Sequence, residues 1–343
     1  MHSKLLRLYA FSSAVAVAAS STVASEPAQN RFENLALRGA LTDQQTGGFD
    51  GPPPQVKLPP VDPERPQDLQ PKSERVQAPP AGQDSSTNTW AIFGFTEGSD
   101  TAGSGERMPF SESVVRLSRR DGKSAGASSN VGIAYATSDH MVVWAAGSSS
   151  YRQSFTGEFN NAQGFGASAG VKYQFLRRNP GPIGLSLQAE PFWERAVERG
   201  PVGRQTFGSQ FRLVVDTALI PSQLFAAVNL AYQPEISVTD LGTGNCESNL
   251  ETSLAISSGV LENVFLGAEV RYQTKYSGLF FSQNSGSAWF TGPTVYVPLG
   301  EKGYFGTAWL IQFHGRAAAE PIQSLDLVNF ERLQMRLKFG YSF

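Results

Sequence analysis

The sequence ends with Leu333-Gln334-Met335-Arg336-Leu337-Lys338-Phe339-Gly340-Tyr341-Ser342-Phe343, and this stretch decides the fold. Large apolar or aromatic side chains occupy every second position, and polar residues or glycine occupy the positions between them. Successive side chains of a β-strand point to opposite faces of the sheet. The alternation therefore predicts a strand with one apolar face and one polar face.

The apolar face of this strand resembles the C-terminal β-signal of Gram-negative outer-membrane barrels, in which a terminal phenylalanine follows apolar or aromatic residues at alternate positions. The residues that fit the signal are Met335, Leu337, Phe339, Tyr341 and Phe343. The resemblance implies that a barrel-assembly machinery recognises this strand, and that outer-membrane lipid surrounds the folded barrel.

The same alternation recurs from Thr89 onward, in segments separated by Gly, Asn, Asp, Pro and Ser. These segments have about 9 to 13 residues, which matches the roughly 9 to 11 residues that a tilted membrane strand needs. We therefore expect an all-β fold, namely a transmembrane antiparallel up-and-down β-barrel of about twelve strands. The expected strands lie near residues 109–120, 128–138, 141–152, 164–176, 182–194, 204–218, 223–234, 249–259, 264–275, 287–298, 304–315 and 331–343.

Residues 90–96 form a further candidate strand, which would make the number odd. An odd number conflicts with the even number of strands in bacterial single-chain barrels. This leaves two options open. Either the segment lies inside the barrel or in the periplasm, or a partner strand escapes notice and the barrel has fourteen strands.

The connections between the expected strands alternate between tight and long, as they do between the two ends of an outer-membrane barrel. We expect long external loops near residues 195–204, 235–248, 275–285 and 316–330. Aromatic residues collect near strand ends, and we expect them to form two girdles at the membrane interfaces. They are Tyr173, Phe175, Phe192, Trp193, Tyr232, Tyr272, Tyr276, Trp289, Phe290, Tyr304 and Phe305.

The N-terminal quarter of the chain has a different composition. Lys4 and Arg7 precede a short apolar run that ends in small residues, which is typical of a secretory signal peptide. We expect residues 1–25 to be that peptide, with cleavage after Ala24 or Ser25. Ten of the 21 prolines lie between Pro52 and Pro80. Residues 26–88 should therefore form a disordered periplasmic arm, and residues 89–343 the outer-membrane barrel.

The polar faces of the strands supply candidates for the lining of the lumen. They carry six basic and four acidic residues, a weak positive excess that would favour anions in a water-filled pore. The alternative is that these charges pair across the interior and close it, because unpaired buried charge is costly. The candidates are Glu112, Arg116, Lys172, Glu190, Arg212, Asp216, Glu269, Arg271, Arg336 and Lys338.

The sequence gives little support for other kinds of chemistry. His140 and His314 lie in no recognisable catalytic motif, so we expect no enzyme and no cofactor. Two dispersed histidines and the single cysteine, Cys246, make no metal-ligand cluster, and Cys246 is expected to be a free thiol in a loop. The net charge of -2 gives no reason to expect a nucleic-acid partner.

The region from Thr89 also resembles a family of porin-like barrels of unassigned function. The resemblance rests on Phe93-Gly94-Phe95-Thr96-Glu97-Gly98-Ser99-Asp100 and on Asn329-Phe330-Glu331-Arg332. We expect a passive channel for small polar solutes, with the arm reaching toward peptidoglycan or another periplasmic partner. The alternatives are a closed structural or assembly barrel, then an autotransporter-type barrel or an outer-membrane hydrolase.

Overall fold

The computed structural model describes residues 89–119, 123–155, 161–178, 181–198, 203–261 and 264–343. The expected signal peptide and arm, residues 1–25 and 26–88, lie outside the described residues. Within the part of the chain that is described, no helix has the length and apolarity needed to cross a membrane.

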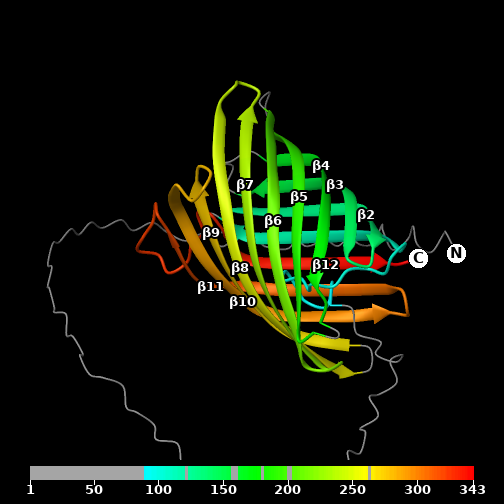
Figure 1. Cartoon of the computed structure of the whole chain (residues 1–343). Coiled ribbons are helices and arrows are strands. Elements are labelled where there is room, and N and C mark those ends of the chain that lie inside the picture. Colours follow the sequence, from blue (N-terminus) through cyan, green and yellow to red (C-terminus); the bar gives the residue numbers. More distant parts are fainter. Residues whose placement is uncertain (1–88, 120–122, 156–160, 179–180, 199–202, 262–263) are drawn as a thin grey trace, which may run out of the picture. The chain divides into compact units, whose positions relative to one another are not determined.

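Twelve antiparallel strands form a closed barrel in which each strand pairs with its neighbours in sequence and β1 closes on β12 (Figure 1). This confirms the expected twelve-stranded up-and-down topology, and the fourteen-strand option is wrong. The strands are β1 Arg107–Arg119, β2 Ser124–Ser138, β3 Met141–Ser154, β4 Ala162–Leu176, β5 Ile183–Glu198, β6 Gly203–Ile220, β7 Leu224–Thr239, β8 Gly244–Leu261, β9 Val264–Ser277, β10 Gln283–Leu299, β11 Gly303–Ala317 and β12 Glu331–Tyr341.

The outward face of the barrel is mainly apolar, and most of the polar faces of the strands point into the barrel. On β4, for example, Phe165 is 52% exposed and Phe175 is 53% exposed, whereas the intervening polar residues Lys172 and Gln174 are buried. A water-soluble barrel would bury the apolar face, so the orientation seen here is the one that a lipid-facing barrel requires.

Several strands are longer than the alternation predicts. The strands β6 and β8 each have 18 residues, and Figure 1 shows the hairpin of β7 and β8 projecting beyond the strands beside it. Three of the four expected long loops are therefore mostly strand, because pairing continues through their polar ends. Cys246 lies in β8 opposite Ile236 rather than in a loop, and its thiol is exposed and free. Residues 318–330 remain a long connection between β11 and β12.

Three of the expected girdle aromatics point into the barrel instead of toward its outer surface. Phe290 is completely buried, and the rings of Phe192 and Tyr304 lie against Gly208 and Gly340 on the inner wall. Adjacent residues in a strand face opposite sides. Pairs such as Trp289-Phe290 therefore place only one ring on the outer surface, and here Trp289 is that ring.

Residues 89–102, here called the interior segment, form turns and bends rather than a strand. Ile92 is 1% exposed and Phe93 is 2% exposed, and both pack against inward-facing residues of β7, β8 and β9. The candidate strand at residues 90–96 is thus neither a thirteenth strand nor half of a hairpin. It lies inside the barrel.

Candidate functional site: the lumen and the segment inside it

The interior segment is bound to the barrel wall mainly through its backbone. Glu269 on β9 accepts hydrogen bonds from the backbone N–H of Phe95 at 2.7 Å and of Thr96 at 2.6 Å, and from the Thr96 hydroxyl at 2.7 Å. Hydrogen bonds to an ionised carboxylate are stronger than those between neutral groups. One buried side chain therefore fixes two consecutive peptide units.

Two further wall residues continue this recognition along the segment. The amide of Asn229 on β7 accepts from the N–H of Glu97 at 2.7 Å and donates to its carbonyl at 2.9 Å, as a neighbouring β-strand would. The carboxylate of Asp216 on β6 accepts from the N–H of Ser99 at 2.9 Å and from its hydroxyl at 2.6 Å. Buried backbone groups need partners, and here side chains of the wall supply them.

The basic residues of the wall bind carbonyl oxygens of the segment. Lys172 Nζ donates to the carbonyl of Gly98 at 2.6 Å, and Arg336 Nη1 donates to that of Phe95 at 3.0 Å. Lys338 Nζ lies 3.4 Å from the carbonyl of Phe93. These charges come from β4 and β12, so the segment is held from strands that lie far apart in the sequence.

Glu97 is the charged side chain at the centre of this arrangement. Its carboxylate lies 2.5 Å from Arg212 and 3.7 Å from Arg336, which also pairs with Glu112 of β1 at 2.5 Å. Burial raises the pKa of Glu97, but the surrounding positive charges, with that of Arg212 the strongest, outweigh burial and lower the pKa from 4.5 to about 2. Glu97 is therefore ionised at neutral pH.

Apolar side chains of the segment fill the remaining space. The ring of Phe95 belongs to a buried cluster with Phe290 and Phe330, and the guanidinium of Arg271 lies 4.1 Å from the centroid of the Phe95 ring. This distance is within the range of a cation–π contact. Both sequence stretches that carry the family resemblance therefore meet in the lumen, since Phe330 comes from the second one.

Two glycines of the interior segment allow its backbone to lie very close to the barrel wall and to another part of the segment. A Cβ on Gly94 would lie 2.4 Å from Glu269 Oε2 and 2.6 Å from the Cβ of Ala308. A Cβ on Gly98 would lie 2.2 Å from the carbonyl oxygen of Thr89. Glycine is needed where no side chain fits, so the tight packing explains both residues.

The structure places the sequence-derived lumen candidates in two groups. Six of them bind atoms of the interior segment directly: Lys172, Arg212, Asp216, Glu269, Arg336 and Lys338. The other four, Glu112, Arg116, Glu190 and Arg271, line the cavity described below, and Arg271 also contacts the ring of Phe95. Arg212, Arg336 and Lys338 of the first group line the same cavity. Arg116 pairs there with Glu331 at 3.2 Å.

Asn229 and Glu97 escape a search of the sequence for charged residues on strands. Asn229 is neutral, although it occupies a polar-face position, and Glu97 belongs to a stretch without strand periodicity. A different signal was present: residues 90–96 make the number of candidate strands odd, which leaves a position inside the barrel as one option for this segment.

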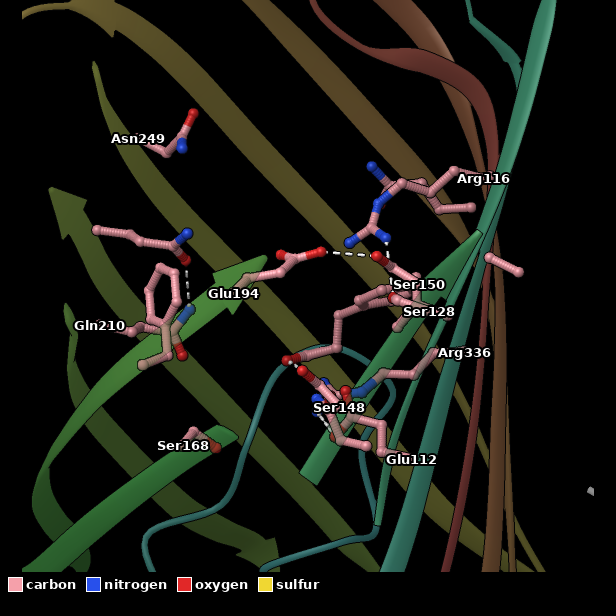
Figure 2. A pocket seen from close by; sticks show the side chains of 18 of the residues that line it. Glu112, Arg116, Ser128, Ser148, Ser150, Ser168, Glu194, Gln210, Asn249 and Arg336 are labelled. Atoms are coloured by element: carbon pink, nitrogen blue, oxygen red, sulfur yellow. Dashed lines mark hydrogen bonds and ion pairs between the residues drawn. The ribbon is translucent and has the colours of Figure 1, made fainter. Parts of the chain in front are cut away.

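A cavity of about 700 Å³ lies above the interior segment, and Glu97, Phe95 and Arg336 contribute to its lining. Figure 2 shows this cavity with Ser128 of β2 and Ser148 and Ser150 of β3 on one side and Gln210 and Asn249 on another. In the same view Glu194 of β5 accepts a hydrogen bond from the Ser150 hydroxyl at 2.6 Å. The lumen thus combines a bound segment with a polar space.

The histidines and the terminal strand lie elsewhere. His140 is in the turn between β2 and β3, where Nδ1 lies 3.1 Å from the carbonyl oxygen of Gln174, and His314 is in β11. Among the described residues, no group of three or more His, Cys, Asp and Glu side chains could hold a metal ion. Phe343 pairs with Arg107 through two backbone hydrogen bonds of 3.0 and 3.2 Å, so the end of the chain lies beside the start of β1.

Comparison with known proteins gives a family and distant structural likenesses. The pattern of a family of unknown function (DUF6662) matches residues 85–343. No curated protein matches the sequence. The translocator domain of the autotransporter NalP from Neisseria meningitidis is 14% identical with a TM-score of 0.45, covering 71% of this chain and 91% of that chain.

Two other solved structures show similar values. The β domain of the Bordetella autotransporter BrkA is 11% identical with a TM-score of 0.49, covering 70% of this chain and 100% of that chain. An outer membrane channel from Pseudomonas putida F1 is 8% identical with a TM-score of 0.47, covering 71% of this chain and 98% of that chain. The twelve-stranded architecture described above follows from the strand pairing of this chain itself.

Proposed function

The chain belongs to the family of unknown function DUF6662, and we propose that this member is an outer-membrane, porin-like channel for small polar solutes, gated by its interior segment. The family brings no activity with it. The proposal therefore depends on the surface of the barrel and on the contents of its lumen.

The outer surface supports insertion in a membrane. Large apolar side chains are exposed on strands throughout the barrel, for example Phe207 at 53%, Leu254 at 51% and Phe313 at 54%. Exposed apolar surface costs about 25 cal/mol per Å² in water, and soluble monomers rarely expose large apolar patches. A lipid environment removes this cost. The expected signal peptide and terminal strand agree with delivery to the outer membrane by an assembly machinery.

The observation that carries the channel proposal is the polar cavity of about 700 Å³ inside the barrel. A closed barrel of this size could be filled by large side chains, as the cores of smaller barrels are. This one instead leaves space lined by hydroxyl, amide and charged groups. The floor of that space is the interior segment, which stands between the cavity and the turns at the other end of the barrel.

The contacts of the interior segment suit a gate. Most of its bonds to the wall are hydrogen bonds and ion pairs, such as those of Glu97 and Glu269, and water can replace each of them if the segment moves. The segment is continuous with the arm at residue 88. We propose that a periplasmic partner or peptidoglycan, by binding the arm, would influence whether the segment stays in place.

A closed structural or assembly barrel is the second candidate. One observation favours it: the charged wall residues Lys172, Asp216 and Arg212 are matched by partners on the segment rather than left facing a water-filled pore. The described residues contain no helix, and the part of the lumen occupied by residues 89–102 holds turns and bends. The structure therefore offers no specific support for an autotransporter.

Single-channel recording in planar bilayers separates the two candidates. We expect brief or rare conductance steps from the full chain and frequent, defined steps from a variant that lacks residues 26–102. The remaining chain keeps all twelve strands. Absence of steps in both proteins, each shown to be folded by its heat-dependent mobility in gels, would support the closed barrel and overturn the channel.

A further inference from the structure

The wall of the cavity carries aromatic rings laid over glycines. A Cβ on Gly170 of β4 would come within 2.1 Å of Cζ2 of Trp144 on β3, and a Cβ on Gly208 of β6 would come within 2.4 Å of Cζ of Phe192 on β5. Both rings line the cavity. Each ring therefore rests on the backbone of the next strand, as in aromatic pairing with strand glycines, and forms part of the inner surface of the barrel.

Two carboxylates lie beside these rings on β5. Glu194 accepts a hydrogen bond from Ser150, and Glu190 is hydrogen-bonded to the side chains of Ser168 and Trp144. Within the described part of the chain neither carboxylate forms an ion pair, so both are held by neutral groups. A carboxylate has about four lone-pair sites, which leaves each of them able to accept more hydrogen bonds.

The side of the cavity formed by β6 to β9 presents neutral amides. Gln210 donates to Gln233 at 3.2 Å, and Asn249 lines the same space. Two arginines there are already engaged, Arg212 with Glu97 and Arg271 with Glu251, and Arg204 of β6 lines the same space. Amide groups both donate and accept hydrogen bonds. This side of the cavity therefore suits an uncharged solute whose groups also donate and accept hydrogen bonds.

From this lining we infer that the cavity binds a neutral polyhydroxylated solute of the size of a mono- or disaccharide. The C–H faces of a sugar ring pack against flat aromatic surfaces such as those of Trp144 and Phe192. Sugar hydroxyls donate to Glu190 and Glu194 and exchange hydrogen bonds with the amides. Ligand cavities commonly measure roughly 300–1,000 Å³, and a cavity of about 700 Å³ falls within that range.

The charges of the lining disfavour ionised solutes of either sign. An anion would approach the carboxylates of Glu190 and Glu194, and a cation would approach the guanidinium of Arg204, which lines the same cavity. Since selectivity in a pore depends on the donors, acceptors and charges that line it, the inference names the solute class of the proposed channel. It rests on that proposed function, but binding can be measured without transport.

The test is isothermal titration calorimetry of the full chain in lauryldimethylamine oxide, a detergent without a sugar head group. Three probes are compared: maltose, sodium gluconate and choline chloride. We expect maltose to bind and the two ions to bind at least tenfold more weakly. Failure of maltose to bind, or tighter binding of either ion, would overturn the inference.

Variants locate the site. Trp144→Leu and Glu194→Gln should each weaken maltose binding about tenfold, whereas Trp144→Phe, which keeps a ring, should stay within about threefold of the original chain. Glu301→Gln, in the exposed turn between β10 and β11, is the control and should bind maltose normally. Equal binding by all four variants would overturn the assignment to this wall.

The two proposals fail in distinguishable ways. Conductance steps in a bilayer without maltose binding would support the channel proposal and overturn the proposal that its solute is a neutral sugar. Maltose binding without steps, in the full chain and in the variant lacking residues 26–102, would show a sugar-binding barrel that does not conduct.

Discussion

Oε1 of Glu97 in the interior segment lies 2.5 Å from Nη1 of Arg212 on β6, and both side chains are almost fully buried. Removing one partner of a buried ion pair leaves the other charge without compensation, at a cost of about 3–5 kcal/mol. The segment and the wall therefore depend on each other. This relationship gives the first prediction.

Replacing Glu97 with Gln should lower the free energy of unfolding by about 3–5 kcal/mol at pH 7, because the buried charge of Arg212 loses its partner. The pKa of Glu97 is lowered to about 2 in the folded protein. Its contribution is thus complete above about pH 4.5 and is lost as the pH falls toward 2. Urea unfolding in detergent, followed by tryptophan fluorescence, measures the free energy of unfolding of both proteins. The difference between the two values should decrease over that pH range. A gap independent of pH would contradict the prediction.

The change Glu269→Gln should loosen the interior segment without unfolding the barrel. One of the two carboxylate oxygens that accept from Phe95 and Thr96 becomes an amide nitrogen, which cannot accept. The loss of about 1–3 kcal/mol corresponds to roughly a 5- to 150-fold increase in the open population.

Maleimide labelling of a cysteine at Ala102, which is 7% exposed, reports this opening. The exposed Cys246 is first replaced by Ser so that it does not react. Glu320→Gln, in the exposed loop after β11, serves as the control. Labelling rates that are equal in Glu269→Gln and the control would show that Glu269 does not hold the segment.

Gly94→Ala should expel the segment from its position, because the added Cβ would meet Glu269, Ala308 and Thr294 at less than 3 Å. Overpacking of this kind costs about 1–3 kcal/mol. We expect more frequent conductance steps in planar bilayers. Gly103→Ala is the matched control, since its Cβ would meet only the flexible side chain of Glu106. Similar conductance in both variants would argue against the segment as a gate.

Leu230→Arg tests the outward-facing surface of β7. Leu230 is 46% exposed on the apolar face, and an arginine facing the middle of a bilayer costs about 2–4 kcal/mol. Folding yield in lipid vesicles should fall clearly. Leu241→Arg, in the turn that follows β7, should fold like the original chain. Equal yields would mean that Leu230 does not face lipid.

The strand number and the outward apolar face were predictable from the sequence because both follow from a local period of two residues. Positions such as Lys172 and Arg336 fall on the polar face whatever their partners are. The ends of the strands were less predictable. Pairing continues through polar residues such as Glu235 opposite Glu247, where no apolar alternation marks the strand.

The contents of the lumen could not be read from local patterns. Glu269 and Lys172 bind backbone atoms of residues 93–99, and no sequence pattern identifies a backbone carbonyl or amide as a partner. The expectation that charges pair across the interior was therefore incomplete. Many of them pair with a separate stretch of chain instead, and only the odd number of candidate strands, with residues 90–96 in excess, pointed to it.

The distribution of wall contacts along the chain also affects the order of folding. The interior segment precedes β1, yet its partners extend from Lys172 on β4 to Lys338 on β12. Contacts between residues far apart in sequence form late, because long loops must close first. The segment can gain its full set of bonds only after the final strand has joined the first. Its docking would therefore be the last step of barrel assembly, and it would require the strands that carry its partners to be in the correct register.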